Sequence, residues 1–187
     1  RTHSRVVQDA YNRLDSVTLI NAYTNTVNIA LRGYLGTTYG PYVYLRLIPI
    51  IQPVIQNLMQ WNVKLSKEIE NLSDPKLKRE FFEKSVKMYD NDAFGLTSTY
   101  TLDDTFQAIN KILVRAQSYI SNTSPVVPNV NLDSEYITWN SLNDLLVACE
   151  KSVELMQSSL RSALDSNHTT LEVMTGMSLG ILFMIFL

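Results

Sequence analysis

Cysteine and histidine are scarce in this sequence, and their scarcity removes several kinds of chemistry. The 187 residues include one cysteine, Cys149, and two histidines, His3 and His168. A lone cysteine cannot form an intrachain disulfide, and three such residues cannot supply a usual four-ligand zinc site. A Ser-His-Asp or Cys-His set would need one of the two histidines, and neither lies on a candidate rigid scaffold. We therefore expect no catalytic, metal or cofactor site and interpret the chain as non-enzymatic.

Charge is also scarce. Charged residues make up 18% of the sequence, against roughly 25% in soluble domains, and the net charge is −2. The densest basic stretch, at 76–79, is interleaved with Glu80 and Glu83 and is typical of a solvated helix face, so we expect no nucleic-acid partner. Low charge favours a surface partly covered by lipid or by other subunits, although a surface rich in Asn, Ser and Thr would give the same composition.

Recognisable ligand-binding loops are missing as well. The glycines Gly33, Gly36 and Gly40 lack the lysine and the strand of a phosphate-binding loop. The segment 90–95 has some spacing of a calcium loop, but Phe94 stands where a ligand belongs. We expect no small-molecule substrate. Three N-x-S/T sequons, at Asn71, Asn122 and Asn167, leave glycosylation undecided.

Apolar residues recur at spacings of three and four, which is the helical period. The sequence predicts an all-α fold, a four- to five-helix antiparallel bundle formed by a helical domain at 1–168. Thr101 and Asp104 resemble a capping box at the start of one helix. The expected helices cover approximately 5–35, 41–72, 74–90, 101–121 and 133–165.

The run from Val173 to Leu187 has no charged residue. Its fifteen residues cover roughly 22 Å as a helix, less than the roughly 30 Å of a hydrocarbon core. We interpret 169–187 as the start of a transmembrane helix that is truncated at Leu187; a helix buried in a soluble core is the alternative. The expected membrane-anchor residues are Val173, Met174, Met177, Leu179, Ile181, Leu182, Phe183, Met184, Ile185, Phe186 and Leu187.

Two further groups of residues suggest protein contacts. Gly176 and Gly180 form a G-x-x-x-G pair, a spacing that lets helices approach closely in lipid. Tyrosines cluster around the glycine-rich break, and the fourth helix has an apolar face. We expect these two regions to contact other subunits through Tyr34, Tyr39, Tyr42, Tyr44, Phe106 and Leu113.

Amphipathic helices, low charge, an apolar end and missing chemistry together favour a structural or assembly protein. We expect it to be membrane-associated, with other protein subunits and the lipid bilayer as its partners. A virion component linking shell and envelope, or a subunit of a membrane complex, would fit. The alternatives are a membrane-active helical protein, such as a pore-former or translocator, and a soluble helical binding module. The side of the membrane is not indicated.

Overall fold

The computed structural model describes the backbone of residues 2–35, 40–91, 98–122 and 132–185. Within these ranges, side chains at 2–3, 25, 28–35, 40–47, 91, 98 and 179–185 are not described. The described chain contains six helices and one β-hairpin. In chain order these are α1 (Thr2–Leu35), α2 (Gly40–Glu70), α3 (Pro75–Phe82), β1 (Val86–Asn91), β2 (Ser98–Asp103), α4 (Thr105–Asn122), α5 (Leu132–Asn140) and α6 (Asp144–Ile185). The prediction of a mostly helical fold is confirmed.

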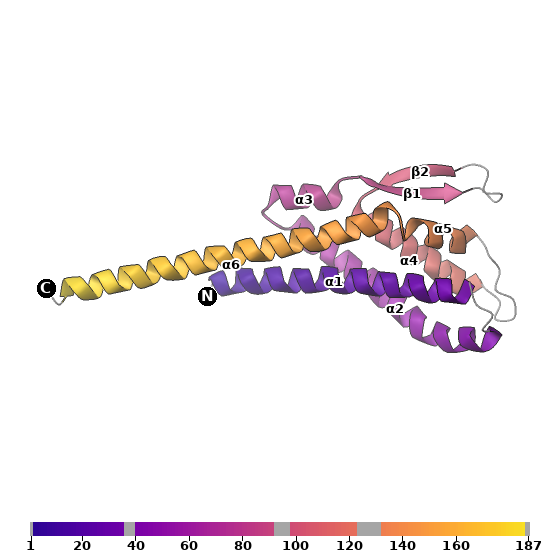
Figure 1. Cartoon of the computed structure of the whole chain (residues 1–187), viewed down its shortest axis with the longest axis horizontal. Coiled ribbons are helices and arrows are strands. Elements are labelled where there is room, and N and C mark those ends of the chain that lie inside the picture. Colours follow the sequence, from indigo (N-terminus) through magenta and orange to yellow (C-terminus); the bar gives the residue numbers. More distant parts are fainter. Residues whose placement is uncertain (1, 36–39, 92–97, 123–131, 186–187) are drawn as a thin grey trace.

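Four long helices, α1, α2, α4 and α6, form the body of the molecule (Figure 1). Helix α1 packs against α6 and α2, and α4 packs against α2 and α5. Figure 1 shows α1 and α6 side by side and running in opposite directions. The Asn21 side chain joins them by donating from Nδ2 to the backbone oxygen of Cys149 at 2.7 Å. An amide at this position fixes how far one helix is displaced along the other.

Apolar side chains from all four long helices meet in one core. Ile55 and Leu58 of α2, Ile112 and Leu113 of α4, and Met156 of α6 are completely buried. Their spacing along each helix places them on one face, which removes apolar surface from water and holds the bundle together. The core is therefore built from the helical periodicity that is visible in the sequence.

The helix expected at 74–90 is wrong in its second half. Asp74 caps α3 by accepting from the backbone N–H groups of Lys76 and Leu77, and Pro75 occupies the first helical position. The helix ends at Phe82, and β1 follows and pairs antiparallel with β2. Val86 and Met88 are buried whereas Lys87 is exposed, which is the two-residue alternation of a strand. The hairpin is the small sheet in a fold that is otherwise helical across the described residues.

The start of α4 also differs from the predicted capping box. Thr101 lies in β2, and Asp104 alone caps the helix by accepting from the N–H of Gln107 at 2.8 Å. The expected helix at 133–165 is likewise two helices, α5 and α6. Between them the Asn140 side chain donates to the backbone oxygen of Tyr136, inside the last turn of α5. A buried amide that competes for backbone groups favours a helix end over continuation.

Helix α6 continues beyond the bundle. Figure 1 shows its C-terminal end extending past the start of α1 with no other element beside it. Met156 is the last fully buried residue of α6, and the side chains described from Leu171 to Ser178 are all exposed. Within the described residues, we find no helix with an apolar stretch sufficient to cross a membrane.

Candidate functional site

The projecting end of α6 carries a group of large, exposed apolar side chains. Leu171, Val173, Met174 and Met177 are between 56% and 64% exposed. Leu171 and Met174 share one face of the helix because they are three residues apart, and Val173 and Met177 share an adjoining face because they are four residues apart. Clustered exposed apolar side chains are a feature of surfaces that contact another protein, a ligand or a membrane.

Polar side chains in this end are satisfied by the helix itself. Thr175 donates to the backbone oxygen of Leu171, and Ser178 donates to that of Met174, both at 2.8 Å. Thr170 donates in the same way to Ser166. These hydroxyl groups therefore need no water, so the segment can enter a nonpolar environment without leaving a hydroxyl donor unpaired.

Gly176 lies within this end, and a Cβ built on it would meet nothing within 4 Å. The glycine is not needed for packing inside the chain, so its face is open. The second glycine of the pair, Gly180, lies in α6 beyond the residues whose surroundings are described. The predicted helix–helix contact stays a prediction.

The other expected site residues fall in two groups. Phe106 and Leu113 are 6% and 0% exposed and face the chain's own core, so their apolar spacing reflects internal packing and not a subunit contact. The remaining expected residues lie where side chains are not described, so the structure does not place them. These are the anchor residues Leu179, Ile181, Leu182, Phe183, Met184, Ile185, Phe186 and Leu187, and the interface residues Tyr34, Tyr39, Tyr42 and Tyr44.

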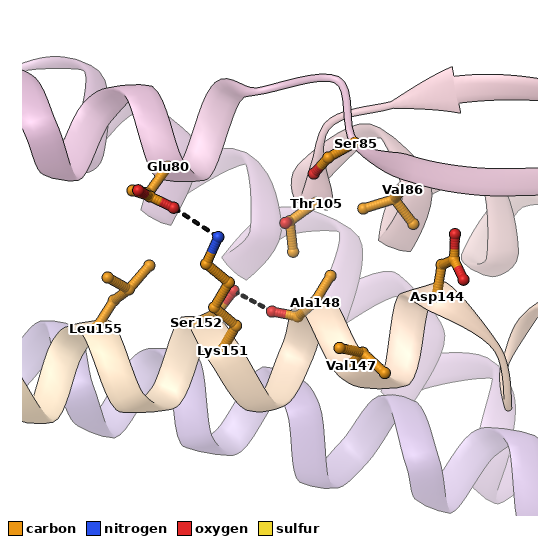
Figure 2. Close-up of a pocket in the computed structure, with 10 residues that line it drawn as sticks. All are labelled: Glu80, Ser85, Val86, Thr105, Asp144, Val147, Ala148, Lys151, Ser152 and Leu155. Carbon is orange, nitrogen blue, oxygen red and sulfur yellow. Dashed lines mark hydrogen bonds and ion pairs between the residues drawn. The ribbon is translucent and has the colours of Figure 1, made fainter.

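A pocket of about 260 Å³ lies on the bundle between α3, the hairpin, the start of α4 and α6 (Figure 2). Lys151 and Glu80 form an ion pair of 2.6 Å at one end, and Asp144 lies at the other. Val86, Val147 and Ala148 contribute apolar surface between the two ends. The pocket therefore has charged groups at both ends, and its middle combines these apolar side chains with the hydroxyl-bearing residues Ser85 and Thr105.

The ionic groups of this pocket are already engaged. The hydrogen bond from Lys151 lowers the pKa of Glu80 and raises that of Lys151, so both stay charged at neutral pH. The Ser152 hydroxyl donates to the backbone oxygen of Ala148 at 2.7 Å. Asp144 accepts from the backbone N–H of Lys87 at 3.3 Å. None of these groups is poised as a nucleophile or a general base.

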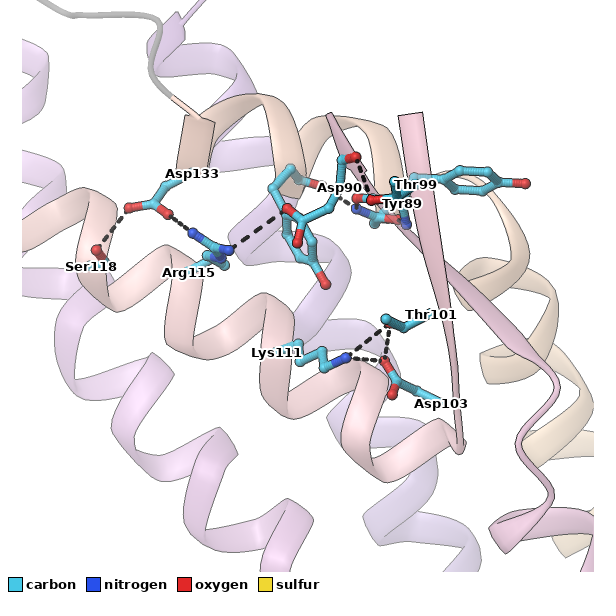
Figure 3. A network of polar contacts seen from close by, with 11 residues as sticks. Tyr89, Asp90, Thr99, Thr101, Asp103, Lys111, Arg115, Ser118 and Asp133 are labelled. Atoms are coloured by element: carbon cyan, nitrogen blue, oxygen red, sulfur yellow. Dashed lines mark hydrogen bonds and ion pairs between the residues drawn. The ribbon is translucent and has the colours of Figure 1, made fainter. Parts of the chain in front are cut away.

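A second polar cluster fastens the hairpin to the helices (Figure 3). Arg115 of α4 donates to Asp133 of α5 at 2.8 Å, and its guanidinium lies 3.7 Å from Asp90 of β1. Ser118 donates to the other carboxylate oxygen of Asp133 at 2.7 Å. The hydrogen bond to Asp133 raises the pKa of Arg115, despite partial burial. Each charge has an opposite partner, which is the pattern of a structural clamp.

Lys111 and Asp103 extend this clamp. The ammonium group of Lys111 lies 2.6 Å from Asp103 and also donates to the Thr101 hydroxyl at 3.1 Å. Asp103 is nearly buried, so the contact with Lys111 compensates the charge that it places in the protein. Sequence reasoning missed this cluster and the Glu80–Lys151 pair. Glu80 and Lys151 lie far apart along the chain, and the other pairs form only where the hairpin, α4 and α5 pack together, so no local pattern signals their approach.

In the described ranges, we find no group of three or more Cys, His, Asp or Glu residues that could hold a metal ion. Comparison with protein-family models, curated proteins and solved structures gives no match for this chain.

Proposed function

We propose that this chain is a non-enzymatic structural or assembly protein that is held at a membrane by the uncharged end of α6. The observation that carries the proposal is the exposure of Leu171, Val173, Met174 and Met177 on a helix that has left the bundle. The sequence continues without charge from Val173 to Leu187. The part of α6 that exposes apolar side chains is thus also the part where the uncharged sequence begins.

The energetics favour transfer of this end into lipid. Moving one large apolar side chain out of water stabilises the transferred state by roughly 1.5–3 kcal/mol. A helix satisfies its own backbone groups, which makes it one of the two structures that lipid accepts. Thr175 and Ser178 already bond to the helix backbone, so they add little cost. The nearest ionisable side chains, Glu172 and His168, form a contact of 3.5 Å and would lie at the membrane surface.

The assembly role is supported by apolar residues on the bundle itself. Trp139, Leu142 and Val147 are between 55% and 64% exposed around the junction of α5 and α6. Aromatic and aliphatic side chains of this kind are enriched where proteins bind one another. Both the projecting end of α6 and these exposed side chains would serve a component that links a virion shell to its envelope, or a subunit of a membrane complex.

Flotation of the full chain on anionic and neutral liposomes, followed by alkaline carbonate extraction, tests the membrane role. We expect the full chain to float and to resist extraction. Removal of 171–187 should abolish both flotation and resistance to extraction. The bundle should stay folded without this segment, because α6 has no fully buried described side chain after Met156. Release of trapped dye from the same liposomes would instead indicate a pore-former.

Matched point variants distinguish membrane insertion of the α6 end from non-specific adsorption of the protein to liposomes. Met174→Lys with Met177→Lys places two charges in the projecting end, where an uncompensated charge in lipid costs about 2.5–3.5 kcal/mol. Gln157→Lys with Ser158→Lys adds the same two charges at solvent-exposed positions of α6 that precede the projecting end. Loss of flotation in the first pair and not in the second supports the proposal. If both pairs float like the unmodified chain, the end of α6 does not hold the protein at the membrane.

A further inference from the structure

One edge of the β-hairpin is closed by side chains of the bundle. Asn140 accepts from the backbone N–H of Tyr89 at 2.6 Å and donates to the Tyr89 oxygen at 2.8 Å, so it pairs with β1 as a neighbouring strand would. Asp144 accepts from the N–H of Lys87 on the same side. The inner edge of β1 is thereby occupied.

These contacts fix the direction of the backbone groups in β2. In an antiparallel pair, successive residues direct their N–H and C=O groups alternately towards the partner strand and away from it. Lys87 and Tyr89 bond away from β2, so the residues opposite them, Leu102 and Tyr100, must direct their backbone groups away from β1. The outward backbone groups of β2 therefore belong to Leu102, Tyr100 and Ser98.

The outer edge of β2 is open along the part of the chain that the structure describes. Figure 1 shows β2 as the outermost element on its side of the molecule. Tyr100 and Leu102 are 57% and 46% exposed. The strand has no lysine or proline and no charge before Asp103, although such residues usually protect an edge from pairing. The edge is thus available to another strand.

We propose that β2 pairs with β2 of a second copy of this chain, antiparallel and centred on Tyr100. In this register Leu102 faces Ser98 of the second copy, and Thr99 faces Thr101. No carboxylate then faces another carboxylate, and two threonine pairs and a tyrosine pair meet across the junction. The outward groups of the three residues give about six backbone hydrogen bonds, and the two hairpins form one four-stranded sheet.

The choice of a second copy follows from this self-complementarity. A two-fold axis at Tyr100 brings the same uncharged strand to both sides, as a symmetric dimer requires. The inference goes beyond the proposed function and does not depend on it, since β2 lies on the bundle and not on the projecting end of α6. Flotation measures binding to a membrane, whereas cross-linking at β2 measures only the pairing of two copies.

Cysteine cross-linking of the full chain in mild detergent tests the pairing. Tyr100→Cys places one thiol on each side of the axis, about 5.5 Å apart between Cα atoms, within the range of a disulfide. We expect a covalent dimer on mild oxidation. Leu102→Cys is the matched control, because the two copies of residue 102 would lie about four residues apart along the strands, roughly 13 Å, and should not cross-link. The native Cys149 is buried and should not contribute.

Sedimentation of two further variants measures the strength of the pairing. Tyr100→Pro removes one outward N–H and leaves the donors between β1 and β2 in place, and Tyr100→Lys sets two like charges at the axis. Each should raise the dimer dissociation constant roughly tenfold or more, whereas Tyr11→Lys on α1 should not. Unchanged thermal melting confirms that the variants fold. Monomeric full chain at all concentrations, or equal cross-linking at residues 100 and 102, would overturn the proposal.

Discussion

The ring of Phe106 stacks on that of Phe81, with ring centroids 5.5 Å apart and planes inclined by 19°. Phe82 lies at the same distance on a tilted plane. Because Phe81 and Phe82 belong to α3 and Phe106 to α4, this aromatic cluster fastens the short helix to the bundle. Stacked aromatic pairs add about 0.5–1.5 kcal/mol to the effect of burial alone.

Phe106→Ala should therefore lower the free energy of unfolding by about 3–5 kcal/mol, through lost burial and the cavity left behind. Urea unfolding followed by circular dichroism measures this change. Val114→Ala on the exposed face of α4 is the control and should change stability by less than about 1 kcal/mol. A variant that kept its stability but lost self-association would return Phe106 to the interface role that its sequence spacing suggested.

Asn140→Ala should remove the side chain that closes the inner edge of β1. The substitution leaves the N–H and oxygen of Tyr89 without their partner, and we expect a loss of about 2–3 kcal/mol. Asn143→Ala offers a matched control, since that amide bonds only to Trp139 in the preceding turn. Hydrogen exchange at the Tyr89 amide should accelerate in the first variant alone. Equal losses of stability in both variants would argue against a specific contribution from the contact between Asn140 and Tyr89.

Asp104→Asn should stabilise the protein at neutral pH. Burial raises the pKa of Asp104 above its ordinary value, although the backbone N–H groups of Gln107 and Phe106 oppose the shift. A raised carboxyl pKa means that the folded state holds the proton more tightly than the unfolded state, so this group disfavours folding at high pH and the penalty disappears as pH falls through its folded pKa. Asparagine caps a helix equally well without the charge.

The advantage of Asp104→Asn should therefore narrow as pH is lowered from 7 towards 4. Urea unfolding of both proteins at several pH values measures it. Asp104→Ala should lose about 1 kcal/mol at neutral pH because it lacks the cap. A stability gain for Asp104→Asn that stayed constant across this range would contradict the assignment.

Cys149 should resist thiol reagents in the folded protein. The side chain is 6% exposed, and burial raises its pKa to about 12, so almost no thiolate forms at pH 8. Reaction with a chromogenic disulfide should be slow in buffer and rapid in denaturant. Ser158→Cys on an exposed position of the same helix should react at once. Rapid labelling of the native Cys149 would show that α1 and α6 separate readily.

The helical part of the fold was accessible from sequence because α4 and α6 repeat their apolar residues at helical spacing. The hairpin was not, because the segment beginning at Val86 is short and its alternation of Val86 and Met88 follows directly on the apolar residues of α3, to which the prediction joined it. Contacts with α5 and α6 decide in favour of a strand, since Asn140 and Asp144 satisfy its free edge.

For the candidate sites as well, the sequence revealed features that depend on local residues and not those that depend on tertiary contacts. The uncharged end of α6 is a continuous stretch and could be predicted directly. Phe106 and Leu113 were assigned to an interface because an apolar helix face looks the same whether its partner is internal or external. The ion pairs of Arg115 and Lys111 depend on neighbours brought together by folding, so no local spacing revealed them.

If α6 holds the protein at a membrane as proposed, its continuity also determines how far the bundle stands from the lipid. From Asp144 to Glu172 an unbroken helix rises about 42 Å at 1.5 Å per residue. With Glu172 at the lipid surface, the hairpin beside Asp144 would stand roughly 40 Å away from the bilayer. Inserting or deleting whole turns of α6 would then widen or narrow that distance by about 5.4 Å per turn.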